Sequence, residues 1–254
     1  STVQHNSQQC TVIEENISIS GIPFFYLQNI SGVVALAEAL EVNRALTSVN
    51  LLKNDLGSGA ATVVAAAKQH GKIKTLCGIK EDETEINWNG LYESVLRTLK
   101  APDAVLLSFD LEFNRSLNSL DLCNNNLGEA SETIAQAVLQ HPTMEVFCKI
   151  PMKKMREDSL TELDLSRKGI GAHGAMVIAP LLEFSRSLNT LDLSHNSIEQ
   201  IAYDTIKVLD NIEQLDLSHN KLQRVPLCLG SRTGLVATGG TGFSALASTV
   251  CCHV

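Results

Sequence analysis

Three near-copies of one segment constrain the fold of this chain more than any other feature of its sequence. EVNRALTSVNL begins at residue 41, EFNRSLNSLDL at residue 112 and EFSRSLNTLDL at residue 183, so successive copies lie 71 residues apart. A fixed offset of this kind is typical of repeat proteins, in which each unit buries its apolar face against its neighbours. The sequence therefore predicts stacked units rather than an ordinary globular domain.

Each copy contains the start of a shorter pattern, LxxLxLxxNxL, that recurs along the chain. The stronger versions begin at Leu46, Leu117, Leu160, Leu188 and Ile212, and weaker ones begin at Ile73 and Met144. The two leucines of LxL have the period of a β-strand, so both point to one side of a short strand. The asparagine after them can accept from and donate to backbone groups at a turn. The sequence thus predicts a structural ladder of Asn54, Asn125, Asn196 and Asn220, with a rearranged turn where Lys168 replaces asparagine.

Helix-like stretches follow the strands. Residues 58–70, 129–141 and 171–184 carry Ala and aliphatic residues at three- and four-residue spacing, as one buried helix face requires. Pro180 lies late in the last stretch, where it should kink or shorten the helix. The start positions given above imply steps of 24 to 28 residues, and the longer steps have room for a strand and a full helix.

These motifs resemble the ribonuclease-inhibitor-like class of leucine-rich repeats, which also occurs in NOD-like receptors and in the Ran GTPase-activating protein. The weak repeats, with TLCGI at 75–79 and VFCKIP at 146–151, are similar to those of leucine-rich-repeat proteins of protists and algae. The resemblance covers about residues 30–228 and implies an α/β fold: a right-handed horseshoe solenoid of seven or eight repeats, with a parallel sheet on the concave face and helices on the convex face.

Two flanking segments and one internal segment depart from the repeat. Residues 1–29 are expected to be irregular or a degenerate first repeat, and residues 229–254 an irregular, Gly-rich tail. Residues 89–100 hold extra chain, which is either a bulged loop that supplies a binding element or part of a drifted repeat. Trp88 and Tyr92 are expected to pack within that repeat.

The concave face supplies the candidate binding residues, since its outward positions follow from the strand period. They are Asn50, Lys53, Asp121, Asn124, Asp164, Arg167, Asp192, His195, Asp216 and His219. Neighbouring strands lie about 4.8 Å apart, so the aspartates would form an acidic stripe. Such a stripe could receive Arg or Lys from a partner through charge-assisted hydrogen bonds. The alternative interpretation is that Asp is simply the common residue of LDLS, present for solubility.

Composition narrows the function classes. The net charge of −8 disfavours nucleic acid and anionic membranes as partners. The seven cysteines are widely spaced and include no CxxC pair, and Cys77 and Cys148 occupy equivalent positions 71 residues apart. We therefore expect reduced thiols in a cytoplasmic protein. No GxSxG, HExxH, Walker or GxGxxG arrangement is present.

The sequence therefore predicts a non-enzymatic protein–protein interaction module, without cofactor or metal, whose protein partner has a basic surface. Two alternatives stay open, both implied only by the resemblance. One is GTPase activation of the Ran type, for which no catalytic arginine could be carried across. The other is a ligand-sensing fragment of a NOD-like receptor.

Overall fold

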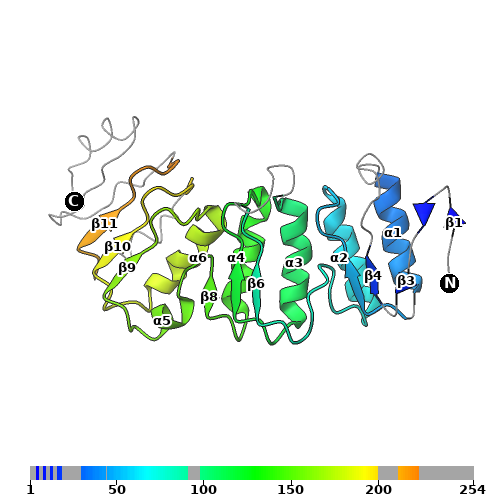
Figure 1. Ribbon diagram of the computed structural model, residues 1–254, viewed down its shortest axis with the longest axis horizontal. Helices are drawn as coiled ribbons and strands as arrows, with labels where there is room; N and C mark the ends of the chain where they lie inside the picture. The colour runs from blue at the N-terminus through cyan, green and yellow to red at the C-terminus, as the bar shows by residue number, and fades with distance from the viewer. Residues whose placement is uncertain are drawn as a thin grey trace, which may run out of the picture. The chain divides into compact units, whose positions relative to one another are not determined.

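The computed structural model describes residues 30–43, 45–90, 98–199 and 211–222, together with the backbone of four short strands between Gln4 and Ser18 (Figure 1). Two compact units divide the chain. Unit 1 comprises residues 1–86, 92–117 and 125–143, and unit 2 comprises residues 87–91, 118–124 and 144–254. The predicted tail at 229–254, Tyr92 and most of the 89–100 segment lie outside the described residues, whereas Trp88 is half-buried.

Unit 1 is built mainly from helices. Its helices are α1 (Ile30–Val42), α2 (Gly59–His70), α3 (Ala101–Phe113) and α4 (Ser131–Gln140), the last preceded by the 3-10 turn η3 (Gly128–Ala130). Each packs against the next, from α1 to α4 (Figure 1). Its strands are β1 (Gln4–His5), β2 (Gln8–Gln9), β3 (Val12–Ile13), β4 (Asn16–Ser18) and β5 (Ser48–Asn50). β4 pairs in parallel with β5, while β1–β2 and β3–β4 are antiparallel.

Unit 2 carries the parallel strands that matter most for function. β7 (Ser119–Asp121) pairs in parallel with β8 (Val146–Phe147). β10 (Thr190–Asp192) lies between β9 (Glu162–Asp164) and β11 (Gln214–Asp216), and both pairings are parallel (Figure 1). The helices are α5 (Met152–Arg156) and α6 (Ala172–Leu182). β6 (Glu85–Asn87) ends where this unit begins, and Trp88 after it donates its backbone N–H to the Asp121 carbonyl.

The apolar positions of the repeat build the core. The leucines and valine of the repeats that begin at Leu46, Leu117 and Leu188 are buried, because strand alternation turns both residues of LxL inward. The three stretches predicted as helices contain α2, α4 and α6, and α6 ends at Leu182, shortly after Pro180. None of the described helices is both long and apolar enough to cross a membrane.

Candidate functional site

Three neighbouring strands of unit 2 place carboxylates in one row. The register pairs Asp192 of β10 with Asp164 of β9 on one side and with Asp216 of β11 on the other. The preceding residues, Leu163, Leu191 and Leu215, are also in register and are buried, so the aspartates point to the opposite face. We call Asp164, Asp192 and Asp216 the acidic row. Adjacent strands in a sheet lie about 4.8 Å apart, which sets the spacing of these carboxylates.

A local hydrogen bond explains why this position is aspartate. In each member of the acidic row, Oδ1 accepts the backbone N–H two residues further on, at 2.8 Å: from Ser166, Ser194 and Ser218 respectively. This is the Asx turn, which stabilises the exit of the chain from a strand. Hydrogen bonds from Ser166 lower the pKa of Asp164 below its ordinary value. The aspartates are therefore both a structural element of the turn and a row of oriented charges.

A second row lies beside the first. Arg167, His195 and His219 are exposed, and each has a left-handed backbone conformation, with φ of 56°, 55° and 55°. The rings of His195 and His219 are stacked, with centroids 4.0 Å apart and planes 9° from parallel. Desolvation lowers the pKa of His195, with His219 and Arg167 adding to the effect against Asp216 and Asp192. We call these three residues the left-handed row.

Asparagine amides hold the turns behind both rows. The Asn196 Nδ2 donates to the carbonyls of Leu165 and Leu193, at 2.9 and 3.0 Å. The Asn220 Nδ2 donates to Leu193 of the preceding repeat at 2.8 Å, and its Oδ1 accepts from the Ile198 N–H. Each amide thus ties two consecutive turns together, as a ladder requires. Such cross-links keep the side chains of both rows at fixed positions.

The turn at Lys168 differs from its neighbours, as the sequence leads one to expect. Lys168 replaces the ladder asparagine, and the next amide takes over: the Asn196 Oδ1 accepts the backbone N–H groups of both Lys168 and Ile170, at 3.1 and 3.0 Å. Gly169 then adopts φ of 71°, and its carbonyl accepts from the Asn124 N–H at 3.0 Å.

Comparison with known families supports the repeat assignment. Residues 183–227 match the family model for leucine-rich repeats, a segment that includes β10, β11 and the turns of His195 and His219. The chain contains leucine-rich repeats. A search of curated proteins found no match to the chain. Leucine-rich-repeat domains generally mediate protein–protein interaction, which agrees with the predicted class of function.

Four predicted residues of these repeats belong to unit 1 and form no row with the six just described. The Asn50 Oδ1 accepts from Leu52 N–H at 3.1 Å, and the Lys53 N–H donates to Asp103 Oδ1 at 2.6 Å. The Asn54 amide bonds the carbonyls of its own turn, Leu51 and Leu52. The Asn125 Oδ1 accepts from the Leu99 N–H at 2.8 Å.

Asp121 and Asn124 require a correction, because both were predicted on an open face. Asp121 is only 5% exposed, and its carboxylate binds the Lys149 Nζ at 2.8 Å, the Asn89 Nδ2 at 3.2 Å and the Cys123 N–H at 3.0 Å. Burial opposes ionisation, but these bonds outweigh it and lower the pKa of Asp121. Asn124 is half-buried, with its Nδ2 bonded to Asn89 Oδ1 at 3.0 Å. Both side chains therefore serve the interior of unit 2.

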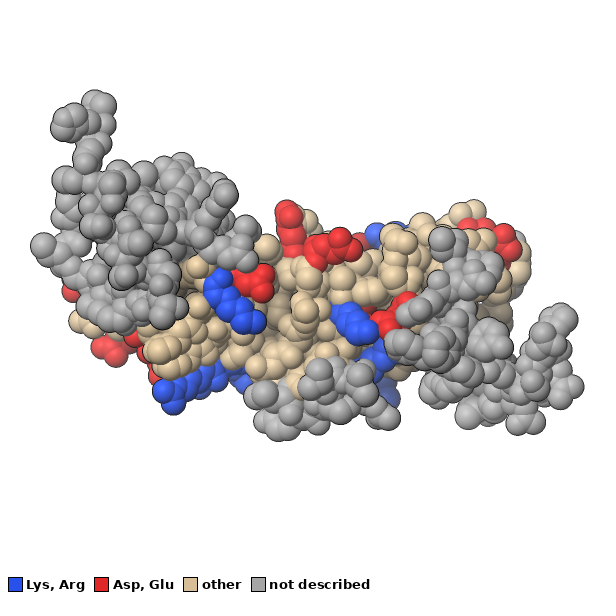
Figure 2. All heavy atoms as spheres, turned by 90° about the horizontal axis from the view of Figure 1, so that it is seen from above, with Lys and Arg blue, Asp and Glu red and all other residues tan. Residues whose placement is uncertain are grey.

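The sequence analysis missed Asn89 and Lys149, the two residues that draw Asp121 inward. No motif marks Asn89, which sits in the drifted segment. Lys149 follows Cys148 in a weak repeat, and only its left-handed φ of 66° shows that its position is special. On the face shown in Figure 2, acidic and basic side chains stand in small groups separated by neutral surface.

Proposed function

We propose that this chain is a non-enzymatic protein-binding module that captures a basic segment of a protein partner on the face of β9, β10 and β11. The observation that carries the proposal is the in-register acidic row of Asp164, Asp192 and Asp216. Arginine and lysine side chains of a partner would bond these carboxylates with charge assistance. The scaffold we propose is a right-handed horseshoe of the ribonuclease-inhibitor-like class.

Preorganisation supports this choice of face. The Asx turns and the ladder amides of Asn196 and Asn220 fix both rows before a partner arrives. Binding then costs little ordering of the site, and that saving contributes to affinity. The stacked imidazoles of His195 and His219 add a flat surface beside the carboxylates, against which an arginine side chain can pack.

Substitution of the acidic row tests the proposal without disturbing the fold. The triple variant Asp164→Asn, Asp192→Asn and Asp216→Asn keeps an Oδ1 acceptor for each turn but removes three charges. A matched control is Glu129→Gln, Glu132→Gln and Glu157→Gln, which removes three exposed charges from helical and turn positions away from these strands. A partner captured with the intact chain should bind the row variant at least about tenfold more weakly, and the control normally.

Binding that is equal for the row variant and the parent would refute the face, and equal weakening by the control would reduce the effect to net charge. Added salt should weaken the complex of the parent chain, because exposed ion pairs are screened.

The proposed class is distinguishable from GTPase activation by direct assay. Adding the chain to small GTPases should leave their turnover unchanged, and an acceleration would contradict a purely binding role. We also propose a cytoplasmic location. Cys77, Cys123 and Cys148 are free thiols in the described part of the chain, which suits a reducing compartment.

A further inference from the structure

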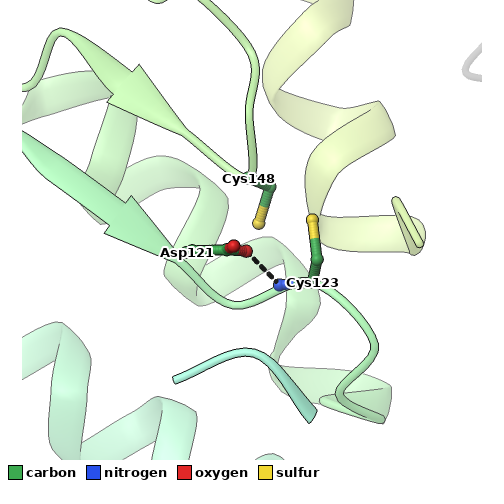
Figure 3. A group of neighbouring side chains, drawn as sticks. All are labelled: Asp121, Cys123 and Cys148. Atoms are coloured by element: carbon green, nitrogen blue, oxygen red, sulfur yellow. Dashed lines mark hydrogen bonds between the residues drawn. The ribbon is translucent and has the colours of Figure 1, made fainter. Parts of the chain in front are cut away.

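A cluster of three buried side chains in unit 2 belongs to neither row of the binding face. Asp121, Cys123 and Cys148 are all buried, and their carboxylate and sulfur atoms lie within 4.8 Å of one another. Figure 3 shows them converging from the end of β7 and from the turn after β8. Two thiols and a carboxylate are a donor set suited to zinc and similar thiophilic cations.

Strand register explains how residues of different repeats meet there. Leu120 of β7 pairs with Phe147 of β8, so the next residues, Asp121 and Cys148, face each other where the strands end. The Cys148 N–H bonds the Leu120 carbonyl at 2.9 Å, and a φ of 48° turns the chain at Cys148. Cys123 follows β7 by two residues. The backbone thus assembles the donors without any contribution from a mobile loop.

The electrostatics of the cluster also suit a cation. A carboxylate has about four lone-pair positions, and those of Asp121 receive hydrogen bonds from Lys149, Asn89 and Cys123. Capacity for a further interaction therefore remains. A divalent cation with two thiolates and one carboxylate carries a net charge of −1, which the Lys149 ammonium 2.8 Å from Asp121 Oδ2 balances.

An unpartnered nitrogen lies close to the same strand end. His173 of α6 is 1% exposed, and its Nε2 is buried without a hydrogen-bond partner among the described residues. The ring is hydrogen-bonded to the backbone of Leu122, packs edge-on against Phe147 with centroids 6.0 Å apart, and interacts electrostatically with Asp121. His173 is not one of the three clustered donors, but it surrounds them with a further metal-ligating group rather than with hydrocarbon alone.

We propose that Asp121, Cys123 and Cys148 bind one thiophilic divalent cation, of which Zn²⁺ is the natural candidate. Binding exchanges two thiol protons for the metal: each S–H bond breaks, a sulfur–metal bond forms, and two protons leave to solvent. No electron is transferred. Because the donors come from two repeats, the bound ion would cross-link β7 to the turn after β8 and stabilise unit 2.

Metal titration of the full chain tests the proposal. Cys10, Cys228, Cys251 and Cys252 lie outside the described residues, so they are first replaced by Ser in the parent used for comparison. Under a non-chelating reductant, that parent should take up one Zn²⁺ per chain by native mass spectrometry. Co²⁺ in place of Zn²⁺ should give a thiolate-to-metal charge-transfer band. Cys123→Ala and Cys148→Ala should each abolish the band.

Cys77→Ala is the matched control, since Cys77 is a buried free thiol beside a buried carboxylate but has no second thiol in the described part of the chain. It should retain full uptake. Should Cys123→Ala or Cys148→Ala fail to fold, Asp121→Asn provides a second measurement, with the thiolate band kept and affinity reduced at least about tenfold. Absence of stoichiometric uptake by the folded parent, uptake that persists in Cys148→Ala, or loss of uptake in Cys77→Ala would each overturn the proposal.

Discussion

Two turns at equivalent positions of the repeat are supported in different ways. Turn 75–79 belongs to unit 1 and turn 146–150 to unit 2, and their cysteines, Cys77 and Cys148, are 71 residues apart and both buried. In turn 75–79 the carboxylate of Asp110 from α3 accepts the N–H groups of Leu76 and Cys77, at 2.6 and 3.1 Å, and the hydroxyl of Thr75. The residue 71 positions after Asp110 is Leu181, which is buried and apolar.

Turn 146–150 satisfies its backbone without a side chain. The Phe147 N–H bonds Ile150 O at 3.1 Å, the Ile150 N–H bonds Phe147 O at 2.8 Å, and the Cys148 N–H bonds Leu120 O at 2.9 Å. Buried donors must find acceptors, and these two turns meet that requirement by a helix carboxylate in one case and by carbonyls in the other. Equivalent repeat positions are therefore not interchangeable, even where the turn sequences are alike.

Exchanging the supporting residue should have the largest effect. Asp110→Leu places the residue of the second turn behind the first and leaves three buried donors without their acceptor. Each such donor costs about 1–3 kcal/mol, so we expect the free energy of unfolding to fall by about 3–6 kcal/mol. Urea denaturation measures it, and amide exchange at Leu76 and Cys77 locates the change. Glu112→Leu on the exposed side of the same helix is the control, and a comparable loss there would contradict the explanation.

The charge of Asp110 should make the stability of turn 75–79 depend on pH. Burial raises the pKa of Asp110 to about 7, against the opposing hydrogen bonds from Leu76, Thr75 and Cys77. The folded pKa exceeds the unfolded value of about 3.9, so the folded state holds the proton more tightly. Stability is therefore greatest below about pH 4 and is lost as pH rises through 7, by up to about 4 kcal/mol. Unfolding measured between pH 4 and 8 should show this slope.

Asp110→Asn removes the titrating group and should flatten that part of the profile, whereas Leu181→Val in unit 2 should leave the slope as it is in the parent. A slope that survives Asp110→Asn would assign the pH dependence to other groups.

The backbone of both turns passes through the left-handed region, but with different residues. Gly78 has φ of 72° and its counterpart Lys149 has φ of 66°. Gly78→Ala should destabilise the protein by about 1–2 kcal/mol, because an L-residue pays that cost in this conformation. Its Cβ would also lie 3.2 Å from the Asn50 Cβ. Gly57→Ala is the matched control, having φ of 55° and no atom within 4 Å of the added carbon. Thermal unfolding that shows Gly78→Ala to be the milder change would refute the crowding.

The repeat pattern predicted the strands and helices well, because both depend on local spacing. Period-2 leucines gave β5, β7, β9, β10 and β11, and their alternation put Asp164, Asp192 and Asp216 on one face. Asp121 has the same local sequence, LDL, as Asp192. It is nevertheless buried, since Lys149 and Asn89 reach it from other repeats. No local rule contains that information.

The same reason applies to Asp110 and to the cysteine pair. Asp110 lies in a helix whose spacing predicts only a buried face, and its carboxylate has a function only when the amides of residues 76 and 77 are brought to it. Cys77 and Cys148 attract attention as equivalents, yet the thiol that lies beside Cys148 is Cys123 of the neighbouring repeat. Such proximity depends on strand register, which the 71-residue spacing does not specify.

Lys149→Gly should produce the smallest change, and it tests whether the second turn bears the strain that glycine avoids in the first. Replacing Lys149 relieves about 1–2 kcal/mol of left-handed strain but removes its half-exposed ion pair with Asp121. That pair is worth about 1 kcal/mol more than an exposed one, because Asp121 is buried. The two effects nearly cancel, and the free energy of unfolding should change by less than about 1 kcal/mol. Lys149→Met removes the ion pair but keeps the strain, so it should be the more destabilising variant in urea denaturation. If Lys149→Gly were instead the less stable of the two, the left-handed conformation would cost little at this position, and the use of glycine at 78 would follow from its contact with Asn50 alone.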